Sequence, residues 1–184
     1  SVRDVVAWNA LIAGHVQQGQ ARAALNYFEH MKIEGLAPNE VTFICVLNAC
    51  GRWGQLCEAE RLFENMVRKY GISPNIEHQI CMVITYGNAG HFDKAMSVIK
   101  SLPISDSLGA WLSLLCACRK WGNVEVAKVA FAQAVELDSN CGAAYVLMAN
   151  VFAAVSMQVA AENVEIIRMK YVFKREHGIS SMWV

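Results

Sequence analysis

The sequence has 184 residues, of which 55% are hydrophobic, so it can bury a sizeable core as one continuous domain. Its 16 lysines and arginines balance its 16 aspartates and glutamates. This neutrality excludes a surface that holds a polyanion by net positive charge alone. The longest mostly apolar stretches, 109–118 and 142–155, are too short to span a bilayer, so no membrane partner is expected.

The most regular pattern in the sequence is a glycine followed by an alanine five residues later. The pairs, the last with serine in place of glycine, are Gly19/Ala24, Gly54/Ala59, Gly90/Ala95, Gly122/Ala127 and Ser156/Ala161. Successive pairs lie 35, 36, 32 and 34 residues apart. A period in this range is typical of stacked helical hairpins, because one hairpin cannot bury its apolar face alone.

Each period predicts two helices joined at the glycine. Apolar residues eleven, eight and seven positions before the glycine (Trp8, Leu11 and Ile12 in the first hairpin) form one face of a helix. The glycine suits a left-handed helix end, and the alanine allows two helices to approach closely. Prolines 38, 74 and 103 then stop the second helices. At Ser156, which lacks the freedom of glycine, we expect a looser turn.

The predicted fold is therefore all-α, an α-solenoid of five stacked helix-turn-helix hairpins. An irregular helical bundle is the alternative, but it would not produce five aligned hairpins. In chain order, the pattern predicts the end of a preceding repeat, five hairpins and a tail, at 1–4, 5–39, 40–75, 76–107, 108–141, 142–175 and 176–184.

The seven cysteines are expected to be reduced and structural. Their number is odd, and no spacing among them suggests a disulfide pair. Free cysteine behaves as a small buried hydrophobe, so a reducing compartment is the natural interpretation.

The sequence of each hairpin resembles a known repeat. Residues 5–39, VVAWNALIAGHVQQGQARAALNYFEHMKIEGLAPN, resemble a P-type pentatricopeptide repeat (PPR), and 40–75 and 76–107 resemble the L and S types. Residues 108–141 and 142–175 resemble the paired, tetratricopeptide-like E motifs. This order is similar to the C-terminal part of plant organellar RNA-editing factors of the PLS subfamily. The tail resembles a degenerate Pro-Gly (PG) box, with His177 where proline is usual.

The resemblance implies which residues contact RNA. In that family, the fifth and last residues of a repeat select one base, which points to Asn9 and Asn39 in the first hairpin. Val6 and Val41 would hold the base between them by apolar contact. Two asparagines imply a pyrimidine, because a primary amide offers both a donor and an acceptor to a base edge. The competing interpretation is that Asn39 is an ordinary helix N-cap, and both roles can coexist.

The next two hairpins are expected to discriminate bases weakly. Their equivalent pairs are Ile44 with Asn75, and Ile80 with Ser107. An isoleucine cannot form a hydrogen bond with a base edge. Sequence recognition is therefore expected to come mainly from repeats that precede Ser1.

No catalytic, metal-binding or cofactor-binding residues are expected in this segment. The DYW-type cytidine deaminase that often follows such arrays needs His-x-Glu and Cys-x-x-Cys motifs. None of the five histidines is followed two residues later by glutamate, and the closest cysteine pair, Cys116 and Cys118, has the wrong spacing. We interpret this pair as core packing.

The resemblance implies a site-specificity factor for C-to-U RNA editing in a mitochondrion or chloroplast. Its expected partners are single-stranded RNA, a DYW-type deaminase in cis or in trans, and accessory editing factors. The alternative is a protein–protein scaffold with little RNA contact, which the neutral charge favours for residues 108–175.

Overall fold

The computed structural model describes residues 4–179, with side chains through Lys170. These residues form ten α-helices and one 3-10 turn, and they contain no strand. The prediction of an all-α solenoid is confirmed. The chain divides into two compact parts, which we call the N-terminal part (Ser1–Ser101) and the C-terminal part (Leu102–Val184).

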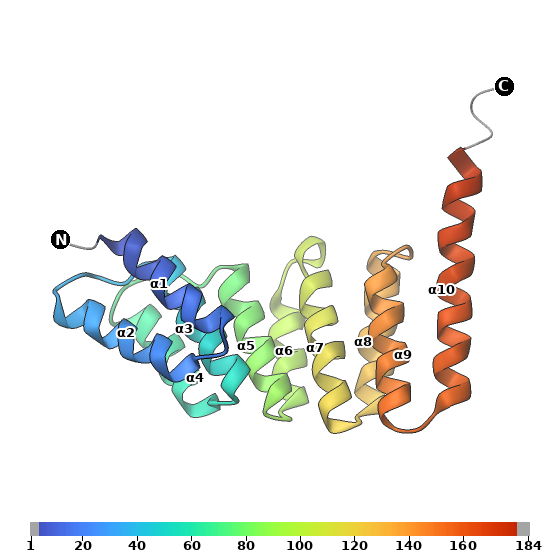
Figure 1. The fold of residues 1–184 in the computed structure, drawn as a ribbon, viewed down its shortest axis with the longest axis horizontal. Helices are drawn as coiled ribbons and strands as arrows, with labels where there is room; N and C mark the ends of the chain where they lie inside the picture. Colours follow the sequence, from blue (N-terminus) through green and yellow to red (C-terminus); the bar gives the residue numbers. More distant parts are fainter. Residues whose placement is uncertain (1–3, 180–184) are drawn as a thin grey trace. The chain divides into compact units, whose positions relative to one another are not determined.

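The N-terminal part consists of three helical hairpins (Figure 1). Within it, the first helix of each hairpin packs against the first helix of the next, α1 on α3 and α3 on α5. Their bounds are α1 Val5–Gln17, α2 Ala21–Ile33, α3 Glu40–Trp53, α4 Leu56–Arg68, α5 Ile76–Asn88 and α6 Phe92–Ser101.

The C-terminal part consists of two further hairpins, and α7 packs on α9 as the first helices do in the N-terminal part. A 3-10 turn, η1, precedes α7 and was not predicted from the sequence. The last helix continues beyond residue 175, into the segment compared with a Pro-Gly box, and residues 180–184 of that segment lie outside the described residues. The bounds are η1 Ile104–Asp106, α7 Leu108–Trp121, α8 Val124–Leu137, α9 Gly142–Ala154 and α10 Gln158–Ile179.

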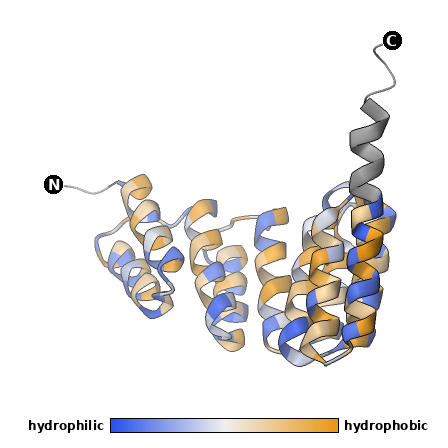
Figure 2. Cartoon of the chain, turned by 45° about the vertical axis from the view of Figure 1, so that its right-hand side comes forward, coloured by the Kyte–Doolittle hydropathy of each residue, from blue (hydrophilic) through white to orange (hydrophobic). Residues whose placement is uncertain are grey.

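The core of each hairpin is built from the apolar positions of the period. Phe43, Val46 and Leu47 of α3 are completely buried, as are the paired alanines through Ala127. Apolar and polar residues are interspersed along the helices (Figure 2). The small alanine side chain lets the two helices of a hairpin approach closely, so the core begins at the turn.

All five turns inside the hairpins share one backbone conformation. Gly19, Gly54, Gly90 and Gly122 have φ between 61° and 82°, which is the left-handed region. In each turn the following residue donates its backbone N–H to the carbonyl five residues earlier, as Gln55 does to Cys50 at 3.0 Å. Ser156 adopts the same conformation with φ 62°, and Met157 donates to Phe152 at 2.9 Å. The expectation of a looser turn at Ser156 is therefore wrong.

The cysteines divide by burial. Cys50, Cys81 and Cys118 are buried, and burial raises the pKa of each thiol to about 12. These three behave as core residues, as expected. Cys116 is exposed, so its interpretation as a core residue is wrong. Residues two apart on a helix point to opposite sides, and here Cys118 takes the buried side.

Candidate RNA-binding site

The structure brings Asn9 and Asn39 together. Asn9 lies in the first turns of α1, and Asn39 is the N-cap of α3, the next first helix. The Asn9 side-chain amide donates to Asn39 Oδ1 at 3.1 Å. Two residues thirty positions apart therefore meet because α1 packs directly on α3.

Asn39 caps its helix in the way that its position predicts. Its Oδ1 accepts the backbone N–H of Thr42 at 3.0 Å, and its own backbone N–H donates to Thr42 Oγ1 at 3.1 Å. This reciprocal pair is a capping box. Asn39 thus has the capping role, and its side chain also contacts Asn9, the other residue expected to contact RNA.

Thr42 completes this site, and the sequence analysis missed it. Its hydroxyl donates to Asn9 Oδ1 at 2.6 Å, and the side chain is completely buried. The available signal was the Asn-x-x-Thr spacing of a capping box. The spacing does not reveal the bond to Asn9, because that bond depends on the packing of two hairpins.

The hydrogen bonds determine which polar atoms remain available. Asn9 is only 7% exposed, and both ends of its amide take part in the network. Asn39 is exposed, and its Oδ1 already accepts from Thr42 and Asn9. Its Nδ2 has no hydrogen-bond partner among the described residues. The exposed edge of the pair is therefore a hydrogen-bond donor.

Val6 and Val41 stand on either side of this pair in sequence, in the first turns of α1 and α3. Val6 is 72% exposed and Val41 is 51% exposed, which is unusual for valine. Exposed aliphatic side chains next to an amide donor can contact the faces of a flat ring. Their role as contacts for a base stays a prediction.

The equivalent position after the second hairpin is also a helix cap. Asn75 Oδ1 accepts the backbone N–H of His78 at 3.1 Å, and the Asn75 backbone N–H lies 3.3 Å from His78 Nδ1. The imidazole is completely buried, and its Nε2 donates to the carbonyl of Glu40 at 3.0 Å. The neutral tautomer with a proton on Nε2 satisfies both contacts. The fifth residue of this hairpin is Ile44, whose aliphatic side chain cannot form a hydrogen bond with Asn75.

In the third hairpin the residue at the last position, Ser107, is buried and forms its side-chain hydrogen bond within its own turn. Ser107 is 6% exposed, and its hydroxyl donates to the carbonyl of Ile104 at 2.9 Å. Its first-helix partner by position, Ile80, is half-buried. Among the three pairs, only Asn9 with Asn39 joins two polar side chains.

The described residues hold neither a metal-binding cluster nor a membrane-spanning helix. Within residues 4–170, no group of three or more histidine, cysteine, aspartate or glutamate side chains is placed to hold a metal ion. No described helix has the length and apolar character needed to cross a membrane.

The hairpins, their shared turn and their stacked first helices define a helical-repeat protein. Family models identify the repeats. The PPR repeat family matches residues 3–52, a second PPR repeat model matches 41–70, and the E motif matches 121–180. The order, PPR repeats followed by an E motif, is consistent with the PLS class.

Relatives with the same repeats occur in Arabidopsis thaliana. Pentatricopeptide repeat-containing protein At1g62260, mitochondrial, is 37% identical over 99% of this chain and 27% of its own length. Pentatricopeptide repeat-containing protein CRR2, chloroplastic, is 40% identical over 84% of this chain and 24% of its own length. The chain belongs to the pentatricopeptide repeat family, and it spans about a quarter of the length of these relatives.

A solved structure shares the fold. The crystal structure of the pentatricopeptide repeat protein PPR10 in complex with an 18-nt psaJ RNA element matches with a TM-score of 0.65. The match covers 100% of this chain and 29% of that one, at 18% sequence identity. At this identity the likeness establishes the fold.

Proposed function

We propose that this segment contributes to the recognition of single-stranded RNA in a site-specificity factor for C-to-U editing. The observation that carries the proposal is the pairing of Asn9 with Asn39, the two positions that select a base in this family. The RNA in the PPR10 complex supports the same class of ligand. Single-stranded RNA exposes its base edges, so a fixed amide can bind them.

In this proposal Asn39 contacts the base, and Asn9 holds the Asn39 side chain in position. Asn9 is buried and holds Asn39 Oδ1, which turns the Asn39 Nδ2 donor outward. Cytosine and uracil share an acceptor, the O2 carbonyl, so one donor binds both and separates them poorly. Val6 and Val41 would contact the two faces of the ring.

The second half of the chain has a different proposed role. The E motif match at 121–180 supports a segment that positions or recruits a DYW-type cytidine deaminase, in cis or in trans. Accessory editing factors are further proposed partners. The compartment names of the relatives, mitochondrial and chloroplastic, support a location in one of these organelles.

The alternative function is a protein–protein scaffold, and one observation favours it for the C-terminal part. The fifth residues of its two hairpins are Leu112, which is half-buried, and Val146, which is 38% exposed. Neither can form a hydrogen bond with a base. A peptide is a better ligand for such an aliphatic surface than an RNA base.

The proposal is tested with the purified 184-residue chain and fluorescein-labelled hexauridine, hexacytidine and hexaadenosine at low salt. We expect the two pyrimidine oligonucleotides to bind, with similar affinities, and hexaadenosine to bind more weakly. Asn39→Ser keeps a capping oxygen but removes the amide donor. It should weaken pyrimidine binding by about fivefold, the value of one hydrogen bond.

Asn75→Ser is the matched control, since it alters the same capping position in the next hairpin, beside Ile44. It should leave RNA binding within about twofold of the parent. Equal effects of the two substitutions would contradict base contact by Asn39. Undetectable binding of all three oligonucleotides would favour the scaffold alternative.

A further inference from the structure

A groove of about 400 Å³ opens in the N-terminal part between the end of α2 and the end of α4. The segment that joins α2 to α3 forms one wall. The groove shares no residue with the amide site (Asn9, Asn39 and Thr42), although Pro38 in its lining directly precedes Asn39. Lys32, Ile33, Leu36, Pro38, Lys69 and Tyr70 line it.

The lining of the groove is largely apolar. Ile33 is 78% exposed, the joint highest value among the large hydrophobic residues of the described chain. A smaller cavity of about 90 Å³ shares Lys32, Lys69 and Tyr70 with the groove. Its wall continues into the core through Phe43, whose ring centroid lies 5.4 Å from that of Tyr70. Apolar surface that stays open to water in this way favours burial by a ligand.

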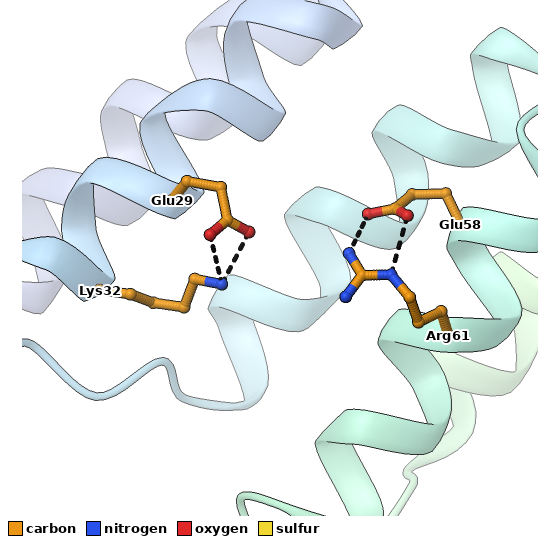
Figure 3. A network of polar contacts seen from close by, with 4 residues as sticks. All are labelled: Glu29, Lys32, Glu58 and Arg61. Carbon is orange, nitrogen blue, oxygen red and sulfur yellow. Dashed lines mark hydrogen bonds and ion pairs between the residues drawn. The ribbon is translucent and has the colours of Figure 1, made fainter.

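Charged side chains border the apolar surface. Lys32 and Arg61 line the smaller cavity. Figure 3 shows their ion pairs, Lys32 with Glu29 on α2 and Arg61 with Glu58 on α4. Each carboxylate is held by a cation three residues away on its own helix. Lys69, by contrast, has no carboxylate partner among the described residues. The groove thus offers one cation for an incoming negative charge.

The same contacts distinguish between ligand classes. The ammonium of Lys69 lies 5.5 Å from the Tyr70 ring centroid, and that of Lys32 lies 4.6 Å from the Phe28 centroid. These cations occupy positions over the ring faces that a stacked base would need. Glu29 is paired with Lys32, so Lys69 is the one cation in the groove lining without a carboxylate partner, which suits a ligand with one negative charge better than a run of phosphates. A ligand with one carboxylate and an aliphatic or aromatic side chain fits better.

We propose that this groove binds a short segment of a partner protein in which an apolar side chain follows an aspartate or glutamate. The carboxylate would pair with Lys69, and the apolar side chain would cover Ile33 and Leu36. The first two hairpins would then have two separate binding surfaces, with the amide site at the start of α3 and the peptide groove between α2 and α4. The proposal does not depend on RNA binding.

The test uses the 184-residue chain and a fluorescein-labelled peptide, Gly-Ser-Asp-Leu-Phe-Ser-Gly, measured by fluorescence anisotropy. Two matched peptides replace Asp by Asn, or Leu-Phe by Ala-Ala. We expect saturable binding of the first peptide and at least about fivefold weaker binding of each of the others. Lys69→Glu should weaken the first peptide about tenfold, because an attraction becomes a repulsion.

Two further variants make the result specific. Arg68→Glu makes the same charge change one residue away, at a side chain that is 80% exposed, pairs with Glu64 and lies outside the groove. It should change the affinity less than twofold. Ile33→Ser, at an exposed position, should weaken binding severalfold without unfolding the chain.

Three outcomes would overturn the proposal. The first is equal weakening by Lys69→Glu and Arg68→Glu, which would indicate only a general charge effect. The second is absence of saturable binding up to about 1 mM peptide, where specific docking becomes negligible. The third is displacement of the peptide by hexauridine together with loss of hexauridine binding in Lys69→Glu, which would make the groove a nucleic-acid site.

Discussion

Ser156 adopts the same left-handed backbone conformation as Gly122, the turn residue of the preceding hairpin, with φ 62° against 61°. A side chain in this region brings Cβ close to the following carbonyl oxygen, which costs about 1 kcal/mol or more. The fold accepts this cost because the turn makes the same backbone hydrogen bond as the other four. Residue 156 is therefore held in place by the hairpin around it.

Replacing Ser156 by glycine should stabilise the protein. The substitution relieves the strained φ, while the greater flexibility of the unfolded chain offsets part of the gain. We expect the free energy of unfolding to rise by about 0.5 to 1 kcal/mol, measured by urea denaturation followed by circular dichroism. Ala153→Gly, at an exposed position in the last turn of α9, is the control and should lower the stability instead of raising it. A loss of stability in Ser156→Gly would contradict the strain.

The opposite change at Gly122 should destabilise the protein more than the same change at Gly54. Both glycines have positive φ, but a Cβ at Gly122 would lie 3.0 Å from Cγ1 of Val155, whereas a Cβ at Gly54 meets nothing within 4 Å. We expect Gly54→Ala to cost about 1 kcal/mol from backbone strain alone, and Gly122→Ala to cost more. Thermal unfolding of the two variants compares them directly, and equal costs would show that Val155 moves aside freely.

Some features of this chain could be predicted from the sequence because they depend on local chemistry. Glycine at four of the five turns favours a left-handed φ, and the alanines marked close helix contacts, so the hairpins and their buried residues could be predicted. The Asn9–Thr42 bond could not be predicted in this way, because its partners lie 33 residues apart and meet only when α1 packs on α3. The burial of Asn9 has the same cause.

Other differences arose where the sequence pattern was interpreted too uniformly. Ser156 departs from glycine in sequence but not in conformation, because tertiary packing overrides local preference. Cys116 and Cys118 were treated alike, although residues two apart on a helix lie on opposite sides. The groove beside Lys69 has no sequence signal, since two helices and a connecting segment form it together.

Thr42→Val should destabilise the protein and disorganise the amide pair. Valine has the shape of threonine but lacks the hydroxyl that donates to Asn9 Oδ1 and accepts from the Asn39 backbone N–H. Leaving such buried groups unpaired costs about 1 to 3 kcal/mol. Thr85→Val is the control, because its hydroxyl donates only to the carbonyl four residues earlier in its own helix. Urea denaturation should show the larger loss for Thr42→Val, and equal losses would contradict a special role for Thr42.

Thiol reactivity should follow burial. The thiolate is the reactive form, and the pKa of about 12 at Cys50, Cys81 and Cys118 leaves almost none at neutral pH. We expect Cys57 and Cys116, which are exposed, to react first with an aromatic disulfide reagent. The Cys57→Ser/Cys116→Ser double variant should lose the fast phase of the native protein. All seven thiols should react together once the protein is unfolded, and a fast phase that persists in the double variant would contradict the assignment.

The contact between Glu60 on α4 and Lys94 on α6 should make part of the stability depend on pH. Lys94 Nζ donates to Glu60 Oε1 at 2.9 Å, and this hydrogen bond holds the pKa of Glu60 below its ordinary value of 4.5. Because the folded-state pKa is the lower one, the contribution to stability is present above pH 4.5 and disappears as the pH falls through the folded-state value.

The unfolding free energy of Glu60→Gln should therefore lie below that of the parent at pH 7. The difference should shrink as the pH falls below 4.5, whereas Glu64→Gln, whose partner lies on the same helix, should show a smaller change. A difference between the parent and Glu60→Gln that stays constant from pH 7 to pH 3 would mean that the carboxylate charge contributes nothing to the link between α4 and α6.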